Sequence, residues 1–300
     1  RWFSWWVKYL NKASNIVYLN GSYVPVEEAT ISVMDRGFLF GDGVYEVVPV
    51  FGNKLLRAKD HLDRLNNSLA RISLQNPCSD DEWMQIFTGL LERNAGNDRA
   101  IYLQVSRGAY PKRDLGIKAE YPPTIFAMVL HVTPPDIEIV SAGISVITVD
   151  DFRWHACDIK STSLVASVML KQQAAAAGVD DAILIRNDML SEGTASNVFV
   201  VRNGVLNTPP TGHKLLPGIT RDLVIEIAKN NAILVEERDI KAAELLDADE
   251  IWMTSSTREI APVIRLNGEV VGSGNAGDMW KRMVDMYQEH KRLLRAGKAL

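Results

Sequence analysis

Four pairs of asparagine and glycine, spread from one end of the chain to the other, constrain the fold more than any other feature. They are Asn20-Gly21, Gly52-Asn53, Asn203-Gly204 and Asn267-Gly268. Each pair separates two strand-like runs, and such pairs favour the tight turns that join antiparallel strands. The sequence therefore predicts antiparallel hairpins in both halves of the molecule.

The hairpins belong to a larger set of predicted elements. Strands are predicted over 16–19, 22–24, 44–51, 54–57, 100–106, 124–132, 143–149, 181–186, 198–202, 232–236, 250–254 and 260–266. Two helices follow residue 59, with Asp60 as candidate cap of the first and Ser79 with Glu82 as a capping box for the second. Further helices are predicted over 163–177, 219–230, 240–246 and 276–294. Strands that cluster apart from the helices favour an α+β fold over an alternating parallel one.

The length of 300 residues fits two domains better than one. The best linker is 133–136, because its adjacent prolines interrupt both helices and sheet ladders. We expect a small domain over 16–132 and a large domain over 137–300. Residues 1–15 are aromatic and basic but lack the features of a signal peptide, so we interpret them as an N-terminal extension, a mispredicted start or a cloning remnant. The alternative for this segment is a short helix that binds a membrane surface or a partner.

Composition and charge exclude several function classes. The net charge is −4 and no long basic block occurs, which argues against nucleic-acid binding. No apolar run approaches the 18 to 20 residues of a membrane span, so no membrane partner is expected. The two cysteines, Cys78 and Cys157, predict neither a disulfide framework nor a zinc site. We expect a cytoplasmic protein without a metal.

Pattern alone offers four candidate sites, each with an ordinary alternative. Gly218-Ile-Thr220 opens a predicted helix whose free amides are available to a phosphate, but it also reads as a plain turn. Thr254–Thr257 is either an anion cradle or a polar strand end. Lys160, between Ile159 and short hydroxyl residues, is either a Schiff-base lysine or a solvated one. Glu192 is either functional or a loop carboxylate.

Six motifs, taken together and in order, carry a family resemblance. They are Ser32–Val47, His61–Leu65, Cys157–Ser161, Ser191–Val198, Leu216–Asp222 and Thr254–Pro262. Their series resembles the fold-type IV pyridoxal-phosphate enzymes, a group that includes branched-chain aminotransferases, D-amino acid aminotransferases and aminodeoxychorismate lyases. The segments Cys157–Ser161 and Arg107–Pro111 are most similar to the D-amino acid aminotransferases. The resemblance covers about residues 16–285.

This resemblance implies roles for the matching residues. Lys160 would form the Schiff base with pyridoxal 5′-phosphate, and Glu192 would face the ring nitrogen and keep it protonated. Tyr45 would lie beside the substrate. The remaining cofactor-binding residues would be Arg64, Ile219, Thr220, Ser255 and Ser256 at the phosphate, and Leu216 against the ring.

The resemblance also implies an activity and an assembly. The activity would be transamination between a D-amino acid, of the D-alanine or D-glutamate type, and a 2-oxo acid with ping-pong kinetics. The alternatives are a branched-chain L-amino acid aminotransferase, an (R)-amine transaminase or aminodeoxychorismate lyase, and a catalytically silent cofactor-binding protein. The cofactor would lie between two domains with mostly antiparallel sheets. A homodimer is implied, with residues of the partner reaching the site.

One segment departs from the family pattern. D-amino acid aminotransferases tend to read Arg-Gly-x-x-Pro-Arg-x-His, where the second arginine and the histidine hold the substrate carboxylate. This chain has Lys112 and Asp114 at those positions, with Arg113 between them. Because arginine binds carboxylates through two parallel hydrogen bonds, we expect Arg113 to take this role after a shift of one residue. Lys112, or an arginine elsewhere, is the alternative.

Overall fold

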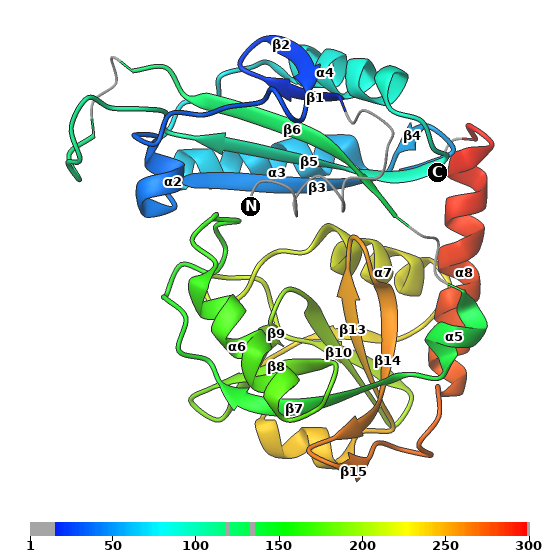
Figure 1. The fold of residues 1–300 in the computed structure, drawn as a ribbon. Coiled ribbons are helices and arrows are strands. Elements are labelled where there is room, and N and C mark those ends of the chain that lie inside the picture. Colours follow the sequence, from blue (N-terminus) through cyan, green and yellow to red (C-terminus); the bar gives the residue numbers. More distant parts are fainter. Residues whose placement is uncertain (1–15, 118–120, 133–135, 299–300) are drawn as a thin grey trace, which may run out of the picture.

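The computed structural model describes residues 16–117, 121–132 and 136–298, and places two β-sheets one above the other (Figure 1). The predicted extension 1–15 and most of the linker 133–136 lie outside the described residues. The division into two domains at that linker therefore stays a prediction. Within the described part of the chain no helix is both long and apolar enough to cross a bilayer. A cytoplasmic location also stays a prediction.

The upper sheet has six strands, all paired antiparallel in the order β2-β1-β6-β5-β3-β4. Its strands are β1 (Ile16–Leu19), β2 (Ser22–Pro25), β3 (Gly43–Phe51), β4 (Lys54–Leu55), β5 (Asp98–Ser106) and β6 (Thr124–His131). At the first hairpin Asn20 and Gly21 have φ angles of 47° and 97°. Positive φ at both central residues is the turn geometry that asparagine and glycine favour, so this predicted hairpin is confirmed.

Two helices pack against the upper sheet, α3 (Ala58–Arg71) and α4 (Asp80–Arg93). The capping box of Ser79 and Glu82 is confirmed at the start of α4. The prediction of Asp60 as a helix cap is wrong, because α3 begins two residues earlier, after Arg57. Asp60 lies in the first turn of α3 and pairs with Arg57 at 3.2 Å. The second hairpin is shorter than predicted, since β4 ends at Leu55.

The lower sheet has nine strands and is mixed. They are β7 (Ile144–Asp150), β8 (Asp181–Arg186), β9 (Met189–Gly193), β10 (Asn197–Arg202), β11 (Val205–Thr208), β12 (Val235–Glu237), β13 (Glu250–Ser255), β14 (Glu259–Leu266) and β15 (Glu269–Val270). The order is β12-β11-β10-β13-β14-β7-β8-β9, with β15 paired to β14. Strand β7 runs parallel to both its neighbours, as β11 does to β12. Antiparallel pairs still predominate, which confirms the α+β class.

The remaining helices connect and cover the sheets. They are α2 (Arg36–Phe40), α5 (Ile137–Ser141), α6 (Val165–Ala176), α7 (Ile219–Asn230), the 3₁₀ helix η1 (Ala242–Asp247) and α8 (Asp278–Arg295). The predicted bounds of α7 are confirmed, whereas the predicted helix 240–246 is the 3₁₀ helix. Strand β9 and helix α2 were not predicted. Four consecutive residues of β9 are buried, so no alternation of polar and apolar residues marks it as a strand.

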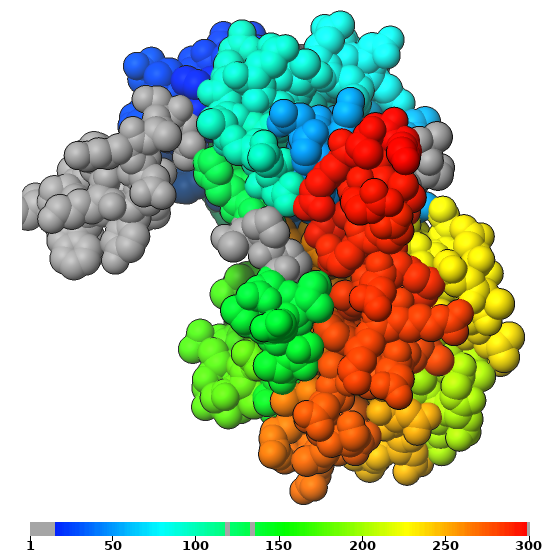
Figure 2. Space-filling view, turned by 90° about the vertical axis from the view of Figure 1, so that its right-hand side faces the viewer, coloured from blue at the N-terminus to red at the C-terminus, as the bar shows by residue number. Residues whose placement is uncertain are grey.

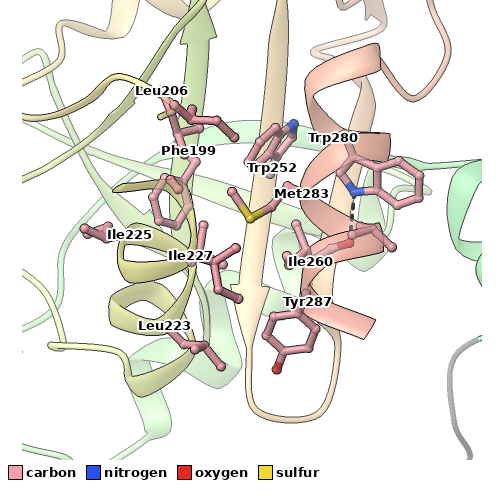
Figure 3. Packing of buried hydrophobic residues seen from close by; sticks show 14 of the residues in the cluster. Phe199, Leu206, Leu223, Ile225, Ile227, Trp252, Ile260, Trp280, Met283 and Tyr287 are labelled. Atoms are coloured by element: carbon pink, nitrogen blue, oxygen red, sulfur yellow. Dashed lines mark hydrogen bonds between the residues drawn. The ribbon is translucent and has the colours of Figure 1, made fainter. Parts of the chain in front are cut away.

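A hydrophobic cluster joins α7 and α8 to β10, β13 and β14 (Figure 3). Trp280 and Met283 of α8 both belong to this cluster, and Trp280 donates from Nε1 to the carbonyl of Ile260 at 3.1 Å. Phe51 and Leu56 of the upper part of the chain belong to the same cluster. Figure 2 shows α8, in red, running across the junction between the upper and lower parts. This helix therefore fixes the two sheets relative to each other.

We expect Met283→Ala to lower the free energy of unfolding by about 2 to 5 kcal/mol, because it leaves a cavity in this fully buried cluster. Urea denaturation followed by circular dichroism measures the change. Met84→Ala is the matched control, since Met84 is an exposed methionine of a helix and its loss should cost within about 0.5 kcal/mol. Equal effects of the two substitutions would contradict the structural role given to this cluster.

Candidate active site

A cavity of about 820 Å³ lies between the two sheets and is lined by residues of both. Its volume falls in the range of small-molecule sites. Nine residues to which the sequence analysis assigned roles line it: Tyr45, Arg64, Lys160, Glu192, Leu216, Ile219, Thr220, Ser255 and Ser256. These residues are distributed over more than 200 positions of the sequence. The fold thus brings residues from separate sequence motifs together in one cavity.

Lys160 is positioned by the backbone of β3. Ser161 forms a bridge with Val44, and the amide of Tyr45 donates to the carbonyl of Lys160 at 2.9 Å. The Nζ atom of Lys160 lies 4.3 Å from the ring centroid of Tyr45. Among the residues that the structure describes, no carboxylate forms an ion pair with this amine. Its nitrogen is therefore available to a ligand in the cavity.

Glu192 lies on β9, is only 4% exposed and accepts hydrogen bonds from three donors, of which Asn197 Nδ2 is the most distant at 3.4 Å. Arg153 Nη1 lies 2.6 Å from its Oε1, and the amide of Leu216 donates to its Oε2 at 3.0 Å. Burial raises the pKa of Glu192, while the charge of Arg153 acts in the opposite direction. Asp151 in turn holds Arg153 with Oδ1 and Oδ2 at 2.9 and 3.0 Å. A cationic ligand nitrogen would find a fixed carboxylate here.

The start of α7 offers an anion cradle. Gly218 precedes the helix and provides no side-chain cap, so the first amides of α7 lack a capping partner. A Cβ atom at 218 would overlap Oδ1 of Asn197, which explains the glycine. Thr254 lines the same cavity, and its buried Oγ1 has no hydrogen-bond partner within the described residues; Ser255 and Ser256 follow it. Unsatisfied donors around a helix N-terminus are suited to a phosphate.

Arg64 connects the two parts of the chain at this cradle. Its Nε and Nη2 donate to the two carboxylate oxygens of Glu46 at 2.7 and 2.8 Å, and its Nη1 donates to the carbonyl of Pro217 at 2.8 Å. His61 Nδ1 lies 2.7 Å from Glu46 Oε2. Burial opposes ionisation of Glu46, but the charge and hydrogen bonds of Arg64, with the hydrogen bond of His61, hold its pKa well below the usual range. Glu46 is thus a buried anion that fixes the direction of Arg64.

Lys112 and Arg113 do not line this cavity. They lie, exposed, on the β5–β6 connection, which projects beyond α2 in Figure 1. The guanidinium of Arg113 lies 4.9 Å from the ring of Phe40. The connection is anchored by Arg36, which donates to the carbonyls of Asp114 and Leu115. The structure of one chain therefore does not bring these residues to the site, and their role stays a prediction.

Several residues of the site were missed by sequence reasoning. They are Glu46, His61, Arg153 and Asn197, of which only the spacing of His61 and Arg64 gave a usable signal. Thr254, by contrast, belongs to the candidate anion cradle Thr254–Thr257. Residues three apart lie on the same face of a helix, so any group that pairs with Arg64 is expected to lie close to His61 as well. The contacts of Glu46 and Arg153 depend on tertiary packing. Glu192 was considered a possible loop residue, whereas it lies in a buried strand.

Comparison with known proteins gives concordant matches. The family model for amino-transferase class IV matches residues 43–266. A D-alanine aminotransferase of Bacillus licheniformis is 38% identical over 89% of this chain and 94% of its own, and one of Listeria monocytogenes is 36% identical over 91% and 95%. A solved branched-chain amino acid aminotransferase of Escherichia coli superimposes with a TM-score of 0.86 at 26% identity, covering 92% of this chain and 94% of that one.

Glu46→Gln tests the buried ion pair of this site. We expect it to lower the free energy of unfolding by about 3 to 5 kcal/mol, because removal of one partner leaves a buried charge uncompensated. Urea denaturation measures the change. The matched control is Glu226→Gln, which removes the half-exposed partner of Arg57 and should cost no more than about 1 kcal/mol. If Glu46→Gln lowers the free energy of unfolding as little as Glu226→Gln does, the Glu46–Arg64 pair does not stabilise the site.

Proposed function

Because the chain belongs to the class IV aminotransferase family, we propose that it transfers the amino group of a D-amino acid, D-alanine in particular, to a 2-oxo acid. The observation that carries this proposal is one cavity in which Lys160, Glu192 and the start of α7 meet. The enzyme class follows from the family match over residues 43–266. The preference for D-amino acids is supported by relatives that are D-alanine aminotransferases.

The cofactor proposed is pyridoxal phosphate, and the donor set fits it. The uncapped start of α7 and the unpartnered hydroxyl of Thr254 suit a phosphate. Arg64, which lines the cavity beside this helix start, is the arginine that the family resemblance assigns to the phosphate. Glu192, buried and directed by three donors, suits a protonated ring nitrogen. The amine of Lys160 suits an aldehyde carbon, since this residue type forms Schiff bases with carbonyl groups.

The chemistry divides between the cofactor and the chain. When bound, pyridoxal phosphate supplies an electron sink and carries the amino group between the two half-reactions. Lys160 Nζ is the base that accepts the proton from the substrate α-carbon, because Lys160 lines the cavity and its amine has no ion-pair partner among the described residues. Glu192 would stabilise positive charge at the ring nitrogen of the bound cofactor. Leu216, whose amide bonds Glu192, lines the cavity with an apolar side chain that limits the entry of water.

A branched-chain L-amino acid aminotransferase is the second candidate. Solved branched-chain enzymes superimpose on this chain with TM-scores of 0.87 and 0.86, at 28% and 26% identity, and the first of them was solved with pyridoxamine 5′-phosphate. The sequence relatives named for D-alanine are more similar, at 36% and 38% identity. An (R)-amine transaminase or aminodeoxychorismate lyase uses similar machinery. The lyase is distinguished by formation of pyruvate without an amino acceptor.

The functional unit proposed is a homodimer. An exposed apolar face runs from Val33 and Phe38 at α2, over Leu115 of the β5–β6 connection, to Val165 and Val168 of α6. The segments before α6 and after α2 are in contact, because Ser163 donates to the carbonyl of Gly41. Exposed apolar patches of this kind mark protein interfaces. The family resemblance implies that residues of such a second copy reach the cavity.

Lys160→Ala tests the enzyme chemistry. We expect transamination to fall at least about 10² to 10⁴-fold, the usual contribution of a general base, and the visible absorbance of lysine-bound cofactor to disappear. Lys171 is unsuitable as a control because it lines the same cavity. Lys281, an exposed residue of α8, serves instead, and Lys281→Ala should behave as the wild type. Turnover of Lys160→Ala near the wild-type rate would disprove the assignment.

A comparison of the variants Arg113→Ala and Lys112→Ala tests which residue binds the substrate carboxylate. Loss of the true contact should cost about 1.5 to 3 kcal/mol, the range for hydrogen bonds to charged groups. This corresponds to a fall in kcat/KM for D-alanine of roughly tenfold to hundredfold. We expect the larger fall for Arg113→Ala, and none with an uncharged (R)-amine as substrate. If neither variant lowers kcat/KM for D-alanine more than kcat/KM for the amine, the β5–β6 connection does not bind the substrate carboxylate.

A further inference from the structure

Helix α8 carries a buried lysine beside the turn that joins β13 and β14. Lys291 is only 1% exposed, which is rare for this residue type. Its Nζ donates to Oε1 of Glu259, the first residue of β14, which is itself 5% exposed. Among the residues that the structure describes, no other carboxylate pairs with this amine. Because a buried charge without a partner is costly, each of these two groups depends on the other.

The carboxylate of Glu259 is held by α8 alone. Gln288, on the same helix, donates from Nε2 to Oε2 of Glu259 at 2.7 Å, so both carboxylate oxygens have a partner on α8. The Nζ atom of Lys291 also lies 4.5 Å from the ring centroid of Phe51 at the end of β3. A cation over an aromatic face is stabilised there. Lys291 is thus fixed between the upper sheet and the start of β14.

Glu259 has a backbone conformation that needs support. Its φ angle is 60°, in the left-handed region that residues with a side chain rarely occupy. Such a conformation persists where the surrounding contacts hold it. The next residue, Ile260, is also held by α8, because its carbonyl accepts the Trp280 Nε1 hydrogen bond at 3.1 Å (Figure 3). Helix α8 therefore fixes the first two residues of β14.

These contacts determine where the β13–β14 turn lies. Glu259 pairs with Ser255 across the hairpin, and both Ser255 and Ser256 line the cavity. Ser255 Oγ accepts the amide of Arg258 at 3.2 Å, and among the described residues its hydroxyl proton has no acceptor. A hydroxyl in this state can donate to an anion. The Lys291–Glu259 pair thus supports a turn with a donor available to a ligand in the cavity.

The same helix reaches the second segment of the anion cradle. Tyr287, one turn before Lys291, is 2% exposed and belongs to the cluster of Figure 3. Burial, with the charge of Glu259, raises the pKa of Tyr287, while the charge of Arg57 and a hydrogen bond with Thr220 act in the opposite direction. Thr220 lies in the first turn of α7 and lines the cavity. Residues four apart share one face of a helix, so this face of α8 contacts both segments.

We propose that Lys291 is a positioning residue for the cofactor phosphate, because through Glu259 it holds the β13–β14 turn where Ser255 and Ser256 can donate to that phosphate. This inference rests on the proposed function, since it presupposes the cofactor. Lys291 does not line the cavity, so it acts through Glu259 and not by contact with the phosphate. Its effect is confined to the phosphate end, since other elements carry Lys160 and Glu192.

Pyridoxal phosphate and pyridoxal differ only in the phosphate group, so the ratio of their dissociation constants isolates phosphate binding. The full-length chain, freed of cofactor, would be titrated with each compound and followed by absorbance. We expect Lys291→Met to reduce the preference for pyridoxal phosphate about tenfold, the fold-change that corresponds to one charged hydrogen bond, and to leave pyridoxal binding unchanged. Glu259→Gln should act in the same direction. Lys291→Arg, which keeps the charge, should retain part of the preference.

The matched control is Arg295→Gln. The Arg295 guanidinium of α8 also lies over the Phe51 ring, at 5.3 Å, but it pairs with Asp98 at 2.6 Å and not with the β13–β14 turn. Its variant should keep the wild-type preference. If Lys291→Met does not fold, Lys291→Arg and Glu259→Gln decide the question.

The outcomes separate this inference from the proposed function. A wild type that binds pyridoxal phosphate and pyridoxal equally would show that the cavity does not hold a phosphate, and the proposed cofactor would fail. A wild type with a strong preference that Lys291→Met leaves intact would overturn the positioning role alone. Equal weakening of both compounds in Lys291→Met, or the same loss of preference in Arg295→Gln, would also overturn it, because the effect would then be a general one on the fold.

Discussion

The site depends on one buried ion pair. Arg64 of α3 is held between the carboxylate of Glu46 on β3 and the carbonyl of Pro217, which immediately precedes the helix start at α7. Because the first two residues pack with the upper sheet and the third belongs to the lower part, this contact fixes the position of the anion cradle relative to the upper sheet. An uncompensated charge in this interior would be costly, so the three groups act as one unit.

The chemistry follows from what surrounds that unit. Lys160 is carried by a segment that pairs with β3, so its amine is positioned by the same strand that carries Glu46. Glu192 approaches the cavity from the lower sheet on a buried strand, with Arg153, Leu216 and Asn197 as its donors. An amine, a carboxylate and an anion cradle on three separate elements are a fixed frame, and fixed charges are what electrostatic catalysis requires.

Sequence patterns predicted the structural elements that depend on interactions between residues close together in the chain. The Asn-Gly turns, the capping box at Ser79 and the whole of α7 depend on neighbouring residues. The motifs also identified nine residues of the cavity, because a family pattern records tertiary proximity indirectly. The partners of Glu46 and Arg153 remained unseen, since these contacts join distant segments. Asp60 failed as a cap because Arg57 in a left-handed conformation starts the helix earlier. The role proposed for Arg113 depends on a second chain.

The central claim is that this cavity performs transamination on D-amino acids, and product chirality tests it most directly. The purified holoenzyme would be incubated with each enantiomer of alanine, glutamate and leucine together with a 2-oxo acid, and the amino acids would be resolved on a chiral column. The account predicts consumption of the D-enantiomers of alanine and glutamate and formation of a D-amino acid from the added oxo acid. Preferential consumption of L-leucine would contradict it.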